Sequence, residues 1–494
     1  MALVGFDSSK YLEMQSRHIH ERIAQFGGKL YLEFGGKLFD DYHASRVLPG
    51  FAPDSKLSML KNLSSEAEIV IVINASDIEK NKVRGDLGIT YDLDVLRLID
   101  LFRQLDFFVG SVVIAQYTGQ ANTEVFKKRL ENLNIKVYLH YPINGYPSNV
   151  PLIVSDEGYG KNEYIETTRP LVVVTAPGPG SGKMATCLSQ LYHEHKKGIN
   201  AGYAKFETFP IWNLPLKHPV NLAYEAATAD LNDINMIDPF HLDAYGQTTV
   251  NYNRDVEIFP VLNAILSKIL GDSPYKSPTD MGVNMAGNCI TDDDIVKQAA
   301  TQEIIRRYYQ AMCSERLGKL NEDAVYKIEL LINQCGTDKA DRPVAAAAMK
   351  IKEKSNLPAV AIELADGRMI TGKTSQLLTA SSAALLNALK EIAGLDDKIH
   401  LLLPSIIGPI QSLKTNHLGY QSPLLHTDEI LIALSVCASS DSSARLALEQ
   451  LPKLRGCEFH STVILPHVDD STLRKLGLNI TCDPTYETDS IYQN

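Results

Sequence analysis

The sequence predicts an α/β fold with a parallel-sheet N-terminal domain, a helical connecting layer and a smaller α/β C-terminal domain. Short apolar segments alternate with amphipathic segments from residue 69 to residue 206, which is typical of a parallel sheet with helices on both faces. A second alternation begins after residue 341. A composition of 45% hydrophobic and 22% charged residues is ordinary for a globular protein. We therefore expect domains at residues 1–290, 291–340 and 341–494.

The first elements along the chain are a helix and a hairpin. The opening segment predicts an amphipathic helix whose N-cap is Asp7 or Ser8. Residues 30–34 and 38–39 flank Gly35-Gly36, so this segment predicts a β-hairpin. The sheet then takes strands at 69–73, 111–115, 136–139, 171–175 and 201–206, separated by helices at 92–105, 123–133 and 184–195.

A glycine-rich loop joins strand 171–175 to the helix that follows it. Its sequence is Pro177-Gly178-Pro179-Gly180-Ser181-Gly182-Lys183. Free N–H groups and the positive end of a helix dipole attract anions at such a position. We expect an anion site made by Lys183 and by the amides of Gly178, Gly180, Ser181, Gly182 and Lys183. The loop therefore predicts phosphate or nucleotide binding in a Rossmann-like or P-loop-like domain.

The loop departs from the P-loop pattern at two positions. Pro177 stands where the pattern has glycine, and Met184 stands where it has the Ser or Thr that binds magnesium. Thr186 could replace that hydroxyl only with an unusual helix start, so the use of Mg is doubtful. Two alternatives stay open. The glycines could only permit close packing, or the loop could bind a dinucleotide with Glu207 as the ribose acid, which Lys183 in place of a third glycine opposes.

Residues 208–290 are irregular, and long irregular stretches usually serve a site or an interface. Asp238 is a weak candidate for the site. Arg254 offers a guanidinium for phosphate, and Asp255 offers a carboxylate for proton transfer or for holding Arg254. The alternative for Asp255 is the N-cap of a helix at 256–270. We expect no metal site, since paired histidines such as His193 and His195 lie on different sides of a helix.

The second half predicts helices and a smaller sheet. Residues 359–363 and 369–371 flank Asp366-Gly367, a hairpin signal, and further strands are expected at 400–403 and 458–465. Helices are expected at 292–318, 321–335, 375–393, 406–415, 427–437 and 441–450. The apolar residues of segment 292–335 cover more than one stripe, which favours a homo-oligomer, dimer or tetramer, with this segment in the interface. The alternative is a helical layer between domains of a monomer.

Charge and composition exclude several classes of partner. A net charge of −11 disfavours nucleic-acid binding, which needs a basic face. We find no apolar run long enough to span a membrane, and we expect no signal peptide, because the first residues lack a basic segment and a sufficient apolar stretch. The seven cysteines are scattered and never form a CxxC pair. This usage predicts reduced thiols in a cytoplasmic protein.

Four phrases of the sequence resemble a large bacterial family of similar chain length, a domain-of-unknown-function family. They are residues 175–186, which include the loop, and residues 251–257, 394–397 and 451–458. Pro177 and Met184 then resemble the family's own version of the loop. The resemblance implies an N-terminal domain similar to nucleotide-hydrolase or Rossmann-like folds, a distinct C-terminal domain, and oligomers. It implies no catalytic residues.

Two functions follow from these observations. In the first, the protein is an enzyme, a hydrolase or transferase that acts on a nucleotide or another phosphorylated small molecule. The loop would bind the phosphate, with Arg254 and Asp238 as weaker partners, and positioning and charge neutralisation would supply most of the catalysis. In the second, the protein is a non-catalytic metabolite-binding or scaffold protein with a degenerate loop. The missing hydroxyl at Met184 motivates this alternative.

Overall fold

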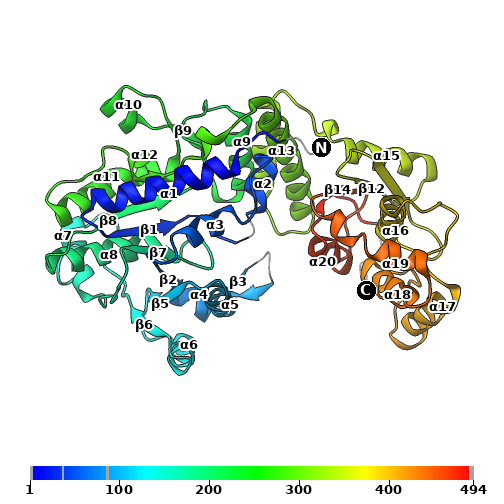
Figure 1. Cartoon of the computed structure of the whole chain (residues 1–494), viewed down its shortest axis with the longest axis horizontal. Helices are drawn as coiled ribbons and strands as arrows, with labels where there is room; N and C mark the ends of the chain where they lie inside the picture. Colours follow the sequence, from blue (N-terminus) through cyan, green and yellow to red (C-terminus); the bar gives the residue numbers. More distant parts are fainter. Residues whose placement is uncertain (1–3, 36–37, 40, 85–87, 489–494) are drawn as a thin grey trace. The chain divides into compact units, whose positions relative to one another are not determined.

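A computed structural model describes residues 4–35, 38–39, 41–84 and 88–488. The described chain forms two compact units, each considered by itself below. The first unit comprises residues 4–225 and 232–300, and the second comprises residues 226–231 and 301–494 with the described part ending at residue 488. Many elements of both units are labelled in Figure 1.

The first unit contains a parallel sheet of seven strands in the order β11-β8-β1-β7-β2-β5-β6 (Figure 1). Every pairing in this sheet is parallel. This arrangement confirms the predicted α/β class and the predicted parallel sheet. The strands are β1 (Leu30–Phe34), β2 (Ala67–Asn74), β5 (Phe108–Ala115), β6 (Lys136–Leu139), β7 (Leu171–Thr175), β8 (Gly202–Phe206) and β11 (Gly282–Val283).

The predicted hairpin at residues 30–39 is wrong. β1 pairs in parallel with β7 on one side and with β8 on the other, so it is a central strand of the sheet. Leu38 and Phe39 form a bend, and Gly36 lies outside the described residues. All five residues of β1 are buried, as is typical of a parallel strand covered on both faces. Gly35 therefore follows an interior strand of the sheet and does not lie at the tip of a hairpin.

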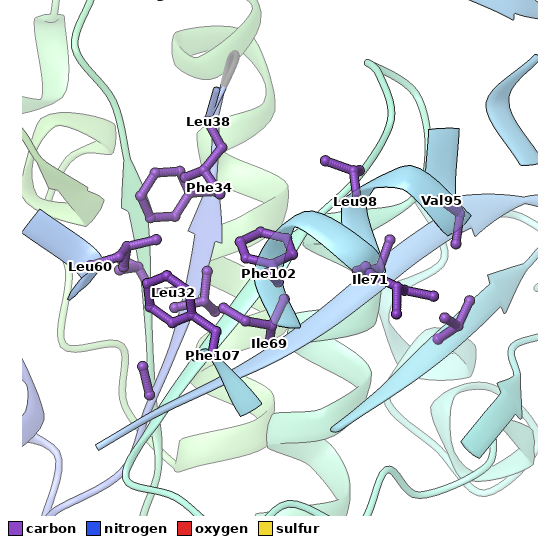
Figure 2. Close-up of a cluster of buried hydrophobic side chains, with 14 of the residues drawn as sticks. Leu32, Phe34, Leu38, Leu60, Ile69, Ile71, Val95, Leu98, Phe102 and Phe107 are labelled. Carbon is purple, nitrogen blue, oxygen red and sulfur yellow. The ribbon is translucent and has the colours of Figure 1, made fainter. Parts of the chain in front are cut away.

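Two apolar layers cover the two faces of the sheet. Leu32, Phe34 and Ile69 belong to the first layer, together with Phe102 of α5 (Tyr91–Gln104), as Figure 2 shows. Side chains alternate along each strand, so Tyr31 and Val174 belong to the opposite layer. The first layer also takes side chains from α1 (Ser8–Gln25), α3 (Ser55–Asn62) and α6 (Ala121–Asn132), and the second from α7 (Val150–Ile153), α8 (Lys183–Lys196) and α11 (Asn253–Leu270).

Short elements complete the first unit. They are α2 (Tyr42–Val47), α4 (Ala75–Glu79), β3 (Val83–Arg84), β4 (Ile89–Thr90), α9 (Pro219–Ala227, whose last two residues belong to the second unit), β9 (Asn235–Ile237), α10 (Pro239–Tyr245), β10 (Val250–Tyr252) and α12 (Pro278–Met281). Besides α11, the described region expected to be irregular thus contains the three helices α9, α10 and α12. α10 begins at a proline because that residue needs no hydrogen-bond partner there. Within the described ranges, every helix is too short or too polar to cross a membrane.

The second unit carries a smaller mixed sheet in the order β13-β12-β14-β15. The predicted hairpin is present, since β12 (Ala359–Glu363) and β13 (Met369–Lys373) pair antiparallel. The predicted strand at 400–403 is wrong, because this apolar segment runs into Pro404 and α17 (Pro404–Ser412). The remaining elements are α13 (Asp293–Arg316, which begins in the first unit), α14 (Glu322–Gln334), α15 (Pro343–Ser355), α16 (Ala380–Ala393), α18 (Thr427–Cys437), α19 (Ser442–Leu448), β14 (Glu458–Ser461), α20 (His467–Lys475) and β15 (Asn479–Cys482).

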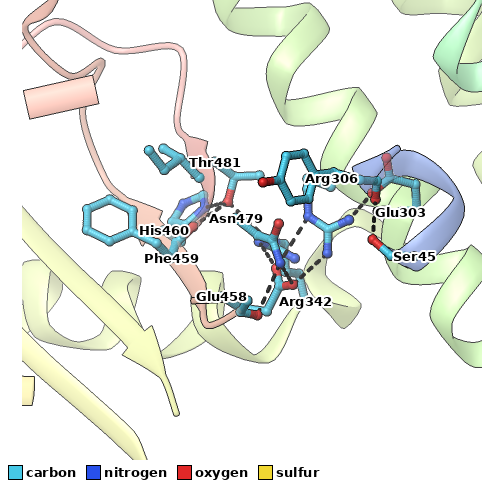
Figure 3. Close-up of polar contacts among 12 residues, drawn as sticks. Ser45, Glu303, Arg306, Arg342, Glu458, Phe459, His460, Asn479 and Thr481 are labelled. Atoms are coloured by element: carbon cyan, nitrogen blue, oxygen red, sulfur yellow. Dashed lines mark hydrogen bonds and ion pairs between the residues drawn. The ribbon is translucent and has the colours of Figure 1, made fainter. Parts of the chain in front are cut away.

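An ionic network ties helices of the second unit to its sheet (Figure 3). The Arg342 side chain is 1% exposed, and its Nη2 lies 2.8 Å from Oε2 of Glu458. Arg306 holds the other oxygen of the same carboxylate, with 2.8 Å between Nη2 and Oε1. Burial raises the pKa of Glu458, but the charges of Arg306 and Arg342 outweigh it and lower this pKa to about 2. The Glu458 carboxylate therefore stays ionised and compensates a buried guanidinium.

We expect Glu458→Gln to lower the free energy of unfolding by about 3 kcal/mol, because it leaves Arg342 buried without a counter-charge. The Glu458 side chain keeps 24% exposure, which places the effect at the lower end for a broken buried pair. Since folding lowers the pKa of Glu458, its stabilisation is present above pH about 4.5 and is lost as the pH falls towards about 2. Denaturant titrations at several pH values measure both effects.

The control is Glu391→Gln, which removes a partner of Arg368 in an ion pair that is about half exposed on both sides. We expect this variant to cost less than about 1 kcal/mol. Equal costs for the two variants would contradict the role given to the buried network.

Candidate functional site

The glycine-rich loop lies at the carboxyl edge of the large sheet, directly after β7. α8 begins at Lys183, and Gly182 is its N-cap with φ +95°. Gly180 has φ +74°, so both positions adopt a conformation that favours glycine. In the part of the chain that the structure describes, no group accepts a hydrogen bond from the backbone N–H of Gly180, Ser181, Gly182, Lys183, Met184 or Ala185. The loop thus keeps its amide donors available, as an anion site requires.

Two loop residues have roles in packing. A Cβ atom on Gly178 would overlap the hydroxyl of Tyr91, the first residue of α5. The Ser181 hydroxyl donates to the Gly178 carbonyl at 2.5 Å, so this side chain is used inside the loop. Asn74, at the end of β2, donates from Nδ2 to the Gly180 carbonyl at 3.4 Å. Close packing therefore explains Gly178, while backbone conformation explains Gly180 and Gly182.

Thr186 lies one turn inside α8 and not beside Lys183 at its start. Its N–H donates to the Gly182 carbonyl at 2.9 Å, the first hydrogen bond of the helix. Its hydroxyl is buried and has no hydrogen-bond partner among the described residues. A buried hydroxyl without a partner carries a free-energy cost, which a ligand or a water molecule at the helix start could remove.

The side chains of Asp238 and Arg254 are both engaged by the protein. The Asp238 carboxylate is fully buried and caps α10 by accepting from the N–H groups of Phe240 and His241. Its second oxygen accepts from the N–H and hydroxyl of Thr279. Arg254 contacts Asp233 with both arms of its guanidinium, at 2.5 Å from Nε and 2.8 Å from Nη2. Both side chains thus have partners within the protein, and a role of either residue in the site stays a prediction.

One expectation was that Asp255 holds Arg254. In the structure Asp255 contacts Lys205 instead, and Arg254 contacts Asp233. α11 begins at Asn253 with Tyr252 as its N-cap, so Asp255 lies in the first helical turn and is not the cap. Its Oδ2 lies 2.5 Å from Nζ of Lys205 at the end of β8. The helix dipole favours a carboxylate at this position. Asp255 therefore joins a group of charged residues that the sequence analysis had not identified.

This group, the carboxylate cluster, consists of Glu33, Lys205, Glu207, Tyr252 and Asp255. Lys205 lies at its centre, 2.6 Å from Oε1 of Glu207 and in contact with the Tyr252 hydroxyl. Tyr252 also donates to Oε1 of Glu207 at 2.5 Å. On the neighbouring strand, Glu33 is directly opposite Lys205 and accepts a hydrogen bond from Tyr203 at 2.7 Å. The cluster therefore spans β1, β8 and the start of α11.

Burial and mutual charge set the protonation states in the cluster. Burial lowers the pKa of Lys205, but Asp255 and Glu207 outweigh it, so the pKa lies well above its ordinary value and the ammonium stays charged. Burial raises the pKa of Glu207, and the charge of Asp255 adds to this rise against the opposing effect of Lys205. Glu207 thus takes up a proton more readily than an ordinary glutamate does. Carboxyl groups with such shifts are common at catalytic sites.

The sheet order brings the cluster to the loop and opposes the dinucleotide alternative. Val174, one residue before the end of β7, is opposite Glu33, which in turn is opposite Lys205. β1 thus lies between β7 and β8, and Glu207 follows a strand two positions away from the loop strand. In the dinucleotide fold, the ribose acid follows the strand adjacent to the loop strand. The sequence did contain one signal for the cluster, namely charged residues inside the buried strands β1 and β8.

We expect Gly178→Ala to lower the free energy of unfolding by about 1–3 kcal/mol, because the added methyl group overlaps the Tyr91 hydroxyl. Tyr91→Phe removes that hydroxyl, so the double variant should lose less stability than the sum of the single variants. Denaturant unfolding measures all four proteins. Gly180→Ala serves as the control, since its cost comes from φ and should be unaffected by Tyr91→Phe. Strict additivity for Gly178 and Tyr91 would contradict the packing explanation.

Comparison with known proteins covers the whole chain. Residues 4–336 match the family model "Domain of unknown function DUF1846, N-terminal", and residues 340–492 match its C-terminal counterpart. The UPF0371 protein of Streptococcus uberis is 58% identical over 493 residues, which is 100% of both chains. The UPF0371 protein of Corynebacterium diphtheriae is 59% identical over 492 residues, 99% of each chain. The loop and cluster described above are therefore features of a chain that belongs to the bacterial DUF1846 (UPF0371) family.

Proposed function

We propose that this protein is an enzyme that acts on a phosphorylated small molecule, nucleotide or otherwise, bound through the loop at residues 177–183. The proposal rests on two features that lie near each other, both at the carboxyl edge of the large sheet. The loop offers amide donors and Lys183, and the carboxylate cluster lies two strands away. In open α/β sheets, ligands bind at the carboxyl ends of the strands.

The two features would divide the chemistry between them. The amides of the loop, Lys183 and the N-terminus of α8 would hold and neutralise the phosphate. Glu207, whose pKa burial raises, would exchange a proton with the reacting group of the substrate, as hydrolysis or transfer of a phosphate ester requires. Mg stays doubtful, because Met184 offers no hydroxyl beside Lys183.

We expect inorganic phosphate, ATP or a sugar phosphate at a concentration near 100 Kd to stabilise the protein by about 2.7 kcal/mol. Lys183→Ala should abolish this stabilisation, because it removes the ammonium from the loop. Lys196→Ala is the matched control, since Lys196 lies at the opposite end of the same helix and is half exposed. Melting scans measure the shift. No shift with any phosphate, or an unchanged shift in Lys183→Ala, would refute phosphate binding at the loop.

The alternative is a non-catalytic metabolite-binding or scaffold protein. It is supported by the internal use of the Ser181 hydroxyl and by the packing of Gly178 against Tyr91. A turnover screen separates the two functions. The homogeneous protein is incubated with a mixed metabolite extract and magnesium, and an enzyme should consume one phosphorylated compound. Glu207→Gln should stop that consumption while it leaves the phosphate-induced stabilisation intact. An extract that stays unchanged would favour the alternative.

The cellular setting and the domain boundaries are part of the proposal. A cytoplasmic location is supported by the seven cysteines, all of which are free thiols. A division at residues 1–290, 291–340 and 341–494 stays a prediction that limited proteolysis would test. Neither a nucleic acid nor a membrane is proposed as a partner.

A homo-oligomer, dimer or tetramer, is also proposed, with an interface on α14. Ile304, Ile305, Tyr308 and Tyr309 of α13 are buried within the chain, so they are not available to a second subunit. On α14, by contrast, Tyr326 and Leu330 are 57% and 60% exposed and lie one turn apart on the same face.

We expect light scattering after size exclusion to give an oligomer mass for the parent chain. Leu330→Glu should lower this mass, because a charge at the centre of an apolar interface is costly. Val125→Glu on α6 is the control, since Val125 is 69% exposed and lies outside the proposed interface. A monomer mass at micromolar concentration would end the proposal of an oligomer.

A further inference from the structure

The carboxylate cluster contains more negative than positive charge. Among the residues that the structure describes, Glu33, Glu207 and Asp255 share the one ammonium of Lys205. If Glu207 carries a proton, Glu33 and Asp255 still face one positive charge. Arg254 does not correct the imbalance, because its guanidinium is paired with Asp233. Tyr203 and Tyr252 stay neutral, since burial raises the pKa of both well above the ordinary value.

Each of the three carboxylates also has one oxygen to spare. Oε2 of Glu33 accepts from Tyr203, Oε1 of Glu207 accepts from Tyr252 and Lys205, and Oδ2 of Asp255 contacts Lys205. Their other oxygens have no hydrogen-bond partner among the residues that the structure describes. Glu33 is the least exposed of the three, with 7% exposure, because it lies in a strand that is paired on both sides. None of these oxygens is a fully buried atom without a partner, so each can reach solvent, and the donor of a bound ligand can replace water there.

The cluster and the loop lie at a distance that one small molecule can span. Neighbouring strands are about 4.8 Å apart, so the ends of β7 and β8 are separated by about 10 Å. Glu33 and Lys205 lie on the side of the sheet that α8 covers, as the alternation along β1 and β8 requires. Burial raises the pKa of the Cys187 thiol, one turn into α8, well above its ordinary value. The charge of Glu33 adds to this rise and the charge of Lys183 opposes it. The two charged regions are thus neighbours on one side of the edge.

We propose that Glu33 and Asp255 form the subsite for an ammonium group of the ligand, so that the substrate is an amine-bearing phosphorylated small molecule. This inference rests on the proposed function, since the loop would hold the phosphate of the same molecule. An ammonium group supplies both the donors that the open oxygens lack and the positive charge that the cluster lacks. A hydroxyl group would supply the donors alone. Two charges of opposite sign at the two ends of the ligand thus match two regions of opposite sign in the protein.

The test compares matched pairs of ligands by calorimetry with the full chain. Glucosamine 6-phosphate and glucose 6-phosphate differ only in an amino group, and O-phosphoethanolamine and ethyl phosphate form a smaller pair. Inorganic phosphate reports on the loop alone. We expect at least one amine to bind about tenfold more tightly than its partner without the amine, and inorganic phosphate to bind as well.

The variants are Asp255→Asn and Glu33→Gln, each of which removes one negative charge from the cluster. Both should reduce the amine preference to about twofold or less, and neither should change the affinity for inorganic phosphate. Asp255 is 14% exposed at the start of a helix, and Asp255→Asn keeps the measurement available if Glu33→Gln fails to fold. Lys183→Ala should weaken all five ligands together, because they share the phosphate.

The outcomes separate this inference from the function on which it rests. If inorganic phosphate binds but neither pair shows an amine preference, the ammonium subsite is refuted and the phosphate site stands. An amine preference that survives in Asp255→Asn also refutes it. If the parent chain binds none of the five ligands and no ATP, the proposed function itself fails.

Discussion

All seven strands of the large sheet run in one direction, and this constraint determines where charged chemistry can gather in the first unit. The carboxyl ends of β7, β1 and β8 must lie side by side, with the glycine-rich loop after β7 and Glu207 after β8. α8 and α11 both start at this edge, so two positive helix ends meet the acidic side chains there. The interior of the sheet is apolar on both faces. The edge is therefore the place where Glu33, Lys205 and Asp255 can be charged together.

Local pattern was sufficient for most of the fold. The alternation of strands and helices, the position of the glycine-rich loop and the hairpin around Asp366-Gly367 all appear in the structure. β1 was misjudged because the pair of glycines after it is a signal for any sharp change of direction, and a hairpin is only one such change. The burial of all five residues of β1 is a tertiary property, and no local rule supplies it.

The candidate site was only half accessible to sequence reasoning. The loop is contiguous, so its chemistry could be derived from its residues. The carboxylate cluster joins Glu33 to Lys205, and the register between these strands depends on which strands pair. Asp238 and Arg254 were selected from their immediate neighbours in the sequence, which do not show what their side chains contact. Buried polar groups usually find partners within the protein, and here Thr279 and Asp233 supply them.

The central place of β1 has a consequence for how the chain folds during synthesis. β1 is complete at residue 34, whereas its two neighbours are complete only at residues 175 and 206. The ribosome therefore releases this apolar strand before either of the strands that pair with it has been made. An unpaired apolar strand is prone to aggregation. Pairing over such separations along the chain is also slow. An interior strand of the sheet is thus the first to be made, and neither of its edges can be paired before residue 175 has been made.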